Sequence, residues 1–146
     1  MASYVTDTMA LIKFLNGQKV INEKIDDIFK KADEGKNIII IPSVVIFEIG
    51  YLFEKNRIPI SIQFIKDITN SNNYIEEILK IEIIESAFEI KDIPELHDRL
   101  IAGTAKFLNI PILTNDPIIK ESSYVTCIWY MLMGCKTSRE FWRLWQ

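Results

Sequence analysis

Four consecutive isoleucines, at positions 38–41, constrain the fold more than any other feature of the sequence. A continuous run of β-branched residues is typical of a strand that is buried on both faces, as the strands of a parallel sheet are. Pro42 ends the run, and a helical apolar pattern follows it, with Ser43 as the expected helix cap. Parallel strands are joined by crossovers that are usually helical. The run therefore predicts a parallel sheet with helices on both sides.

Strand and helix patterns alternate along the rest of the chain. Further strands are predicted at residues 3–6, 111–114 and 125–129. Helices are predicted at residues 7–15, 20–34, 43–56, 60–69, 82–91 and 97–108, with a helical turn at 116–121. Residues 74–81 fit neither period. The alternation predicts an α/β fold, namely a three-layer α/β/α sandwich with a mainly parallel central sheet.

Length and composition set the limits of this plan. The 146 residues are 49% apolar, which fits one domain, and residues 1–129 are assigned to it. Residues 130–146 form a tail, read either as a short aromatic helix or as an appended non-native segment. The net charge of −3 argues against a broad basic surface that wraps nucleic acid. It leaves room for a nucleic acid held by a metal ion and a few basic side chains.

The sequence also indicates the cellular compartment. It has no signal-peptide pattern and no apolar stretch of about 20 residues, so a cytoplasmic protein without a membrane segment is expected. The cysteines, Cys127 and Cys135, form no CxxC pair, and reduced thiols are expected.

Four acidic residues lie at the ends of the predicted buried elements. Asp7 follows the first strand and Asp116 follows the strand at 111–114. Ligands of open parallel sheets bind beyond the carboxyl ends of the strands, where the strand order reverses. Glu48 falls on the apolar face of one helix, and Asp98 falls at the beginning of another. All four carboxylates are therefore expected to point into one crevice.

A cluster of this kind needs compensation. Two like charges about 4 Å apart repel by about 4 kcal/mol at an effective dielectric constant near 20. Shared protons or bound cations are the available remedies, and an all-oxygen set of ligands favours Mg²⁺ or Mn²⁺ over zinc. Two such ions can activate a water and stabilise the attacking and leaving oxygens of a phosphodiester. The four acids are thus candidate metal ligands and catalytic residues.

Neighbouring polar residues are candidates for supporting roles. The hydroxyls of Thr8 and Thr114 lie beside the acids in sequence and could orient a carboxylate or a phosphate oxygen, although helix capping is an equal alternative for Thr8. Asn115 is a further candidate for contact with the substrate or the acids. The candidate phosphate contacts are Lys13, Lys55 and Arg57.

Simpler interpretations exist for each acid. Asp7 or Asp116, taken alone, would most often cap a helix. Asp98 could cap its helix or pair with Arg99, and Glu48 could reach the rim or meet a lysine. The placement of all four at corresponding positions favours the metal site over these separate explanations.

Other chemistries find less support. His97 is the only histidine, so a Ser-His-Asp triad would depend on it alone. Neither the GxxxxGK[ST] loop nor the GxGxxG fingerprint occurs. A phosphoacceptor aspartate would require a lysine at the end of a late strand, and none is present.

Four segments, each containing one of the acids, resemble the acidic motifs of PIN-domain nucleases in the same order. They are YVTDTMAL (4–11), PSVVIFEI (42–49), HDRLIA (97–102) and LTND (113–116). The resemblance extends over residues 3–129, and the compact length is similar to that of the VapC toxins of toxin–antitoxin pairs. The tail beyond Trp129 departs from the compact members.

The resemblance implies a PIN-like sandwich and a metal-dependent ribonuclease that is often a homodimer. It also implies an antitoxin partner that occludes the acidic site. Asp7, Glu48, Asp98 and Asp116 correspond to the Mg²⁺ or Mn²⁺ ligands of the family, with Thr114 as a hydrogen-bonding neighbour.

The leading hypothesis is an endoribonuclease that cleaves RNA by metal-activated water, acting as the toxin of a VapBC-type pair. The alternatives are a stand-alone RNA-processing nuclease and a PIN-like protein-binding module with little turnover.

Overall fold

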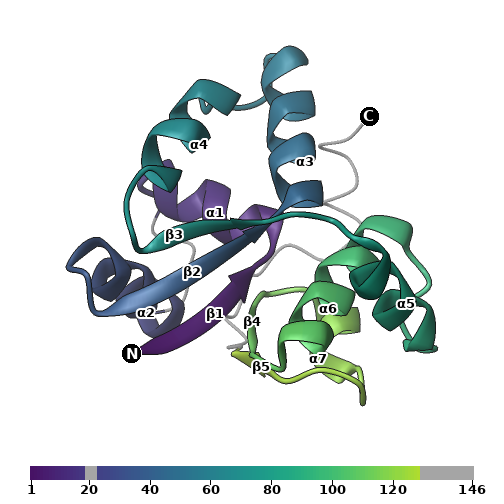
Figure 1. Ribbon diagram of the computed structural model, residues 1–146. Coiled ribbons are helices and arrows are strands. Elements are labelled where there is room, and N and C mark those ends of the chain that lie inside the picture. Colours follow the sequence, from purple (N-terminus) through teal and green to yellow (C-terminus); the bar gives the residue numbers. More distant parts are fainter. Residues whose placement is uncertain (19–22, 129–146) are drawn as a thin grey trace.

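The computed structural model describes residues 1–18 and 23–128, so the predicted tail helix and Cys135 lie outside the described residues. Within them, five strands form one parallel sheet in the order β3-β2-β1-β4-β5 (Figure 1). The strands are β1 (Ala2–Thr6), β2 (Asn37–Pro42), β3 (Tyr74–Glu77), β4 (Ile112–Leu113) and β5 (Cys127–Ile128). The predicted parallel sheet is confirmed, and the ambiguous segment at 74–81 contributes the edge strand β3.

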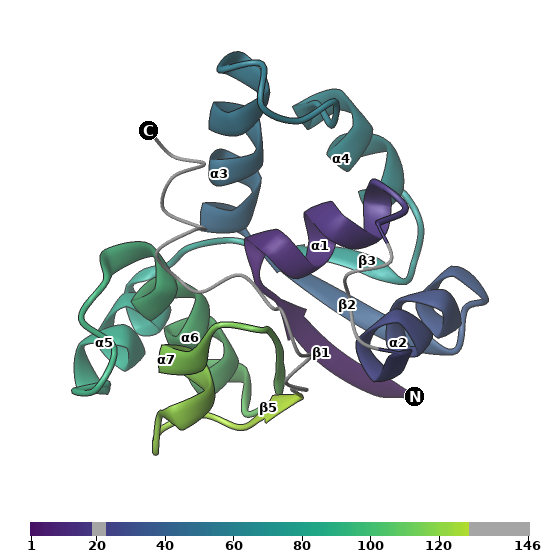
Figure 2. The same ribbon diagram turned by 180° about the vertical axis from the view of Figure 1, so that it is seen from behind.

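Helices connect the strands, as predicted. They are α1 (Thr8–Leu15), α2 (Glu23–Asp33), α3 (Ser43–Glu54), α4 (Ile62–Thr69), α5 (Ile81–Glu89), α6 (Leu96–Leu108) and α7 (Pro117–Glu121). In Figure 1, α1 and α2 lie behind β1 and β2, and in Figure 2 they lie in front of them. Because parallel crossovers are right-handed, the return from β3 to β4 carries α5 and α6 to the opposite face. The result is the predicted α/β/α sandwich.

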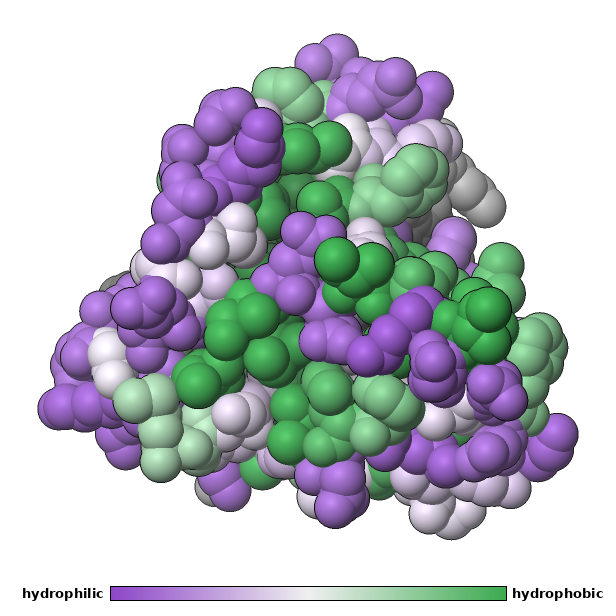
Figure 3. Space-filling view, viewed as in Figure 1, coloured by the Kyte–Doolittle hydropathy of each residue, from purple (hydrophilic) through white to green (hydrophobic). Residues whose placement is uncertain are grey.

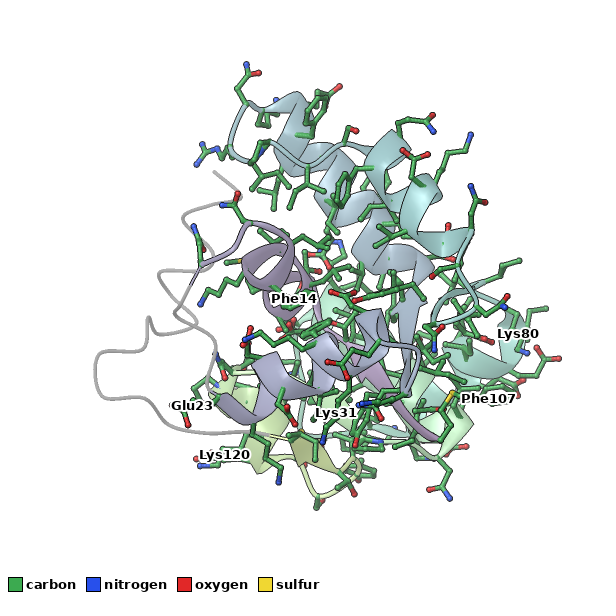
Figure 4. All side chains as sticks on the ribbon, turned by 90° about the vertical axis from the view of Figure 1, so that its left-hand side faces the viewer. Phe14, Glu23, Lys31, Lys80, Phe107 and Lys120 are labelled. Atoms are coloured by element: carbon green, nitrogen blue, oxygen red, sulfur yellow. The ribbon has the colours of Figure 1, made fainter. Side chains whose placement is uncertain are left out.

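The isoleucine run forms the centre of the core. Ile39 and Ile41 are fully buried, and Ile40 between them is 9% exposed. Successive strand residues point to opposite faces, so both faces of β2 are covered. On one face, the rings of Phe14 and Phe29 stack with their centroids 4.6 Å apart, which joins α1 to α2 (Phe14 is labelled in Figure 4).

The other helical layer is also tied together by side chains. The Lys80 ammonium, just before α5, lies 4.7 Å from the centroid of the Phe107 ring of α6 (Figure 4). Among the described helices, none combines the length and apolar character that crossing a bilayer requires.

The structure corrects the role predicted for Ser43. Its side chain does not cap α3, since Ser43 is the first helical residue and the cap position belongs to Pro42. The Ser43 hydroxyl instead donates to the Glu77 carbonyl at 3.2 Å and accepts from the Leu79 amide at 3.1 Å. Ser43 therefore fixes the chain where it leaves β3.

The strand order reverses between β1 and β4. The chain proceeds from β1 to β2 and β3 on one side, and then returns to place β4 on the other side of β1. The carboxyl ends of β1 and β4 thus form the point at which ligands of such sheets bind. Asp7 follows β1 directly, and residues 114–116 follow β4.

Candidate metal centre

Asp7 is both a helix cap and a member of the acidic site. Its Oδ1 accepts a hydrogen bond from the Ala10 amide at 2.8 Å, which caps α1. Its Oδ2 accepts a short hydrogen bond from the Thr114 hydroxyl. Burial raises the pKa of Asp7 from 3.8 to about 6, while these two hydrogen bonds oppose the rise. The capping alternative and the site hypothesis are therefore compatible.

Glu48 is buried on α3, with 3% of its surface exposed, and finds its partner on α1. The Thr8 hydroxyl donates to Glu48 Oε1 at 2.9 Å. Burial raises the pKa of Glu48 from 4.5 to about 8, and the hydrogen bond from Thr8 only partly offsets it. Thr8 is not the cap of α1, a role that belongs to Asp7. The Thr8 hydroxyl instead orients the Glu48 carboxylate through its hydrogen bond.

Thr114 connects the acids that follow β1 and β4. It donates to Asp7, and its oxygen accepts the Asp116 amide at 3.0 Å. Asp116 in turn caps α7, with Oδ1 accepting from the amides of Ile118 at 2.8 Å and Ile119 at 3.4 Å. Burial raises the pKa of Asp116, while these two amides oppose the rise.

Asp98 lies in the first turn of α6 and is 7% exposed. Burial raises its pKa from 3.8 to about 8, and the charges of the other three predicted acids and of Glu95 add to the rise. Within the described residues its carboxylate accepts no hydrogen bond. Both simpler interpretations are wrong: the Arg99 guanidinium donates to the carbonyls of Ile93 and Pro94, and the cap of α6 is Glu95.

Glu95 is the residue of this region that the sequence interpretation missed. Its Oε2 accepts the Asp98 amide at 2.7 Å. Helix α6 begins at Leu96 rather than at the predicted His97, so Glu95 occupies the cap position. The sequence carries no strong signal for this cap, because the preferred cap residues are serine, threonine, asparagine and aspartate.

The four predicted acids share one electrostatic environment, since the charges of Asp7, Glu48 and Asp116 all raise the pKa of Asp98. In the described part of the chain, no group of three acidic, histidine or cysteine side chains forms a ready-made cage for a metal ion. Mg²⁺ does not need such a cage, because it keeps several waters and binds through one or two carboxylates. The oxygen-only set and its surplus of negative charge fit such an ion.

Two further groups complete the surroundings. The side-chain oxygen of Asn115 is buried and has no hydrogen-bond partner among the described residues. The Cys127 thiol keeps its proton, because burial and the charges of Asp7 and Asp116 raise its pKa to about 12.

The predicted phosphate contacts differ in their relation to the site. The Lys13 charge lowers the pKa of Asp7, so its ammonium group lies within electrostatic reach of the acids. The Lys55 ammonium lies 5.5 Å from the centroid of the Tyr51 ring, at the end of α3. Arg57 follows in the turn after that helix.

Comparison with known proteins identifies the family. The PIN domain family model matches residues 4–122. A chain of VapBC2 from Rickettsia felis, crystallised with a DNA fragment from its promoter, aligns with a TM-score of 0.64 at 15% identity, covering 90% of this chain and 100% of that chain. A chain of DNA-bound VapBC from Salmonella typhimurium aligns with a TM-score of 0.61 at 13% identity and the same coverage.

A chain of a toxin–antitoxin complex from Klebsiella pneumoniae gives a TM-score of 0.56 at 17% identity, covering 84% of this chain and 95% of that chain. No curated protein matches the sequence. At these identities the structural likeness establishes the fold, and the family model establishes the relationship. PIN domains are generally nucleases that use divalent metals. The chain belongs to the PIN domain family, as its four acidic motifs predicted.

Proposed function

We propose that this protein is a Mg²⁺- or Mn²⁺-dependent endoribonuclease and the toxin of a VapBC-type toxin–antitoxin pair. One observation carries the proposal: Asp7 and Asp116 follow β1 and β4, Glu48 and Asp98 lie on α3 and α6, and the charges of the other three acids raise the pKa of Asp98. An accumulation of carboxylates at the reversal point of a parallel sheet is expected where a cation and a phosphodiester are to be held.

The hydrogen bonds of the site distinguish Glu48 and Asp7 from Asp98. Thr8 and Thr114 orient Glu48 and Asp7, so that each of these carboxylates keeps one fixed direction. Asp98 has no such bond among the described residues and is the acid best able to turn toward a cation. A divalent cation bound here supplies an activated water and stabilises the charge that develops on the phosphate.

When no cation is bound, protons on the carboxylates reduce the repulsion within the cluster. Burial keeps the pKa values of Glu48 and Asp98 at about 8, so both carry protons for much of the time at neutral pH. Binding of a cation releases these protons, because only the ionised carboxylates are good ligands. The affinity for Mg²⁺ or Mn²⁺ should therefore increase with pH.

The proposed partners follow from the fold and the surface. The three similar structures described above are VapBC or toxin–antitoxin complexes, which supports an antitoxin partner. We propose that this partner covers the acidic site. Several large apolar side chains are exposed, among them Phe47, Ile81 and Phe88 at 69%, 72% and 64%. On the face of the molecule seen in Figure 3, apolar patches lie across the middle and on the right. Such patches suit contact with an antitoxin or with a second copy in a homodimer.

The decisive experiment is cleavage of a mixed RNA substrate in Mg²⁺, Mn²⁺ or EDTA by the wild type and by Asp98→Asn. The asparagine keeps the shape and removes the charge that holds the cation. We expect cleavage that needs the metal and falls by orders of magnitude in the variant. Asp67→Asn on the exposed side of α4 is the matched control and should retain full activity. Equal cleavage by the wild type and Asp98→Asn would contradict the proposal.

A further inference from the structure

Glu95 holds the backbone that carries Asp98. Its backbone is extended, and its Oε2 accepts the Asp98 amide at 2.7 Å, which makes it the cap of α6. Its other carboxyl oxygen lies 3.4 Å from Nδ1 of His97. One oxygen thus accepts a hydrogen bond in the first turn of the helix, and the other lies near an imidazole nitrogen without accepting a hydrogen bond from it. The orientation of Asp98 depends directly on this side chain.

The identity of the residue is more informative than its capping role. Serine, threonine, asparagine and aspartate are the preferred caps, and glutamate is not among them. A serine would satisfy the Asp98 amide without adding charge. Glu95 instead places a fifth carboxylate beside the site, and its charge contributes to the raised pKa values of Glu48, Asp98 and Asp116. Helix capping alone does not explain this extra charge.

A bound cation would account for the extra negative charge of Glu95. Mg²⁺ and Mn²⁺ keep coordinated waters, and carboxylates outside the coordination shell hold those waters and the ligands in place. Glu95 is suited to such a role, since it is hydrogen-bonded to the main chain of Asp98 and its side chain is still 23% exposed.

We propose that Glu95 is a positioning residue for the divalent cation: it orients Asp98 through the helix cap and strengthens cation binding through its charge from outside the coordination shell. This inference rests on the proposed metal-dependent function. It extends that function to a fifth acid that does not belong to the predicted set of four.

The test is the dissociation constant of Mn²⁺, measured by electron paramagnetic resonance of the free ion, with no RNA present. Glu95→Ser keeps a good cap and removes the charge, and Glu95→Gln removes the charge at constant length. Both should bind Mn²⁺ about 10- to 100-fold more weakly than the wild type. Glu95→Asp keeps a cap and a charge and should recover most of the affinity. Glu85→Gln, on the exposed side of α5, is the charge-matched control.

Unfolding of the metal-free proteins separates this role from a structural one. Glu95→Ser should melt at or above the wild-type temperature, because the cap remains and a repulsive charge is gone. Wild-type Mn²⁺ affinity in both Glu95→Ser and Glu95→Gln would overturn the inference and leave Glu95 as a helix cap. A wild type that does not bind Mn²⁺ would also overturn the inference. A wild type that binds Mn²⁺ with the expected ranking but cleaves no RNA would refute the proposed nuclease and leave the role of Glu95 intact.

Discussion

At the scale of single residues, the Thr114 hydroxyl joins the two acids that follow β1 and β4. It is fully buried, donates to Asp7 and accepts the Asp116 amide. Thr114→Val keeps the shape and leaves both partners without their hydrogen bond. A buried group that loses its partner costs about 1–3 kcal/mol, so we expect the free energy of unfolding to fall by that amount in urea titrations.

The matched control is Thr69→Val, because the Thr69 hydroxyl donates to the Lys66 carbonyl at the exposed end of α4. Water can replace that bond, and the loss should stay below about 0.5 kcal/mol. Equal losses in the two variants would mean that the Thr114 hydrogen bonds contribute nothing beyond an ordinary surface contact.

The four acids could be named as candidates from the sequence, because Asp7, Asp98 and Asp116 follow or begin an element with a clear apolar pattern and Glu48 falls on the apolar face of a helix. Glu95 could not. The predicted helix begins at His97, so Glu95 falls outside it and in the connection after the helix predicted at residues 82–91. Glutamate is also a poor indicator of a cap. Thr8 was a candidate for orienting a carboxylate, but its bond to Glu48 in particular was not predictable, because it joins residues that are 40 positions apart.

At the scale of elements, the close packing of α5 against α6 depends on Gly103. A Cβ at this position would lie 2.7 Å from the Cβ and 2.8 Å from the Cα of Ala87. Alanine favours a helix over glycine by about 1 kcal/mol, but overpacking against a backbone costs about 1–3 kcal/mol. We therefore expect Gly103→Ala to lower the melting temperature and, since α6 carries Asp98, to weaken Mn²⁺ binding.

Gly50→Ala on α3 is the natural comparison. The added Cβ would meet Ile62 Cδ1 at 2.8 Å, but that atom is the far end of a flexible side chain that is 47% exposed. Ile62 can move aside, so the helix propensity of alanine should dominate and stability should be unchanged or higher. A Gly103→Ala variant as stable as Gly50→Ala would show that α5 and α6 can separate freely.

Elements differ in how clearly the sequence specifies them. The isoleucine run is β-branched throughout and is followed by a proline, which favours a buried strand, and β2 is that strand. By contrast, β3 is at the edge of the sheet, where Ile75 is apolar although it is 39% exposed, so the apolar residues of this segment do not mark its buried face. The pairing of β1 with β4 joins distant residues and is set by the packing of the whole sheet rather than by local sequence.

At the scale of the whole molecule, the acidic site should make stability depend on pH. The folded state raises the pKa of Glu48 from 4.5 to about 8 and that of Asp98 from 3.8 to about 8, mainly through burial. Between these limits the folded protein binds more protons than the unfolded chain does. The free energy of unfolding contributed by these groups is therefore full at acidic pH and decreases as the pH rises toward 8.

Thermal unfolding in EDTA from pH 5 to pH 8 measures this dependence directly. The wild type should melt at progressively lower temperature, by several degrees in total, and the double variant Glu48→Gln, Asp98→Asn should lose most of the slope. Glu85→Gln should keep it. The hydrogen bond with Lys106 lowers the pKa of Glu89, so Glu89 changes its protonation below this pH range and does not mask the effect.

Saturating Mn²⁺ should reverse the trend, because the cation binds the ionised carboxylates and only the folded chain presents them together. The increase in melting temperature caused by Mn²⁺ should then be small at pH 5 and largest at pH 8. A melting temperature in EDTA that is independent of pH, together with a Mn²⁺ effect of constant size, would mean that the acids are solvated separately. Opposite slopes with and without the metal would instead link the buried charge of the fold to the cation that the proposed chemistry needs.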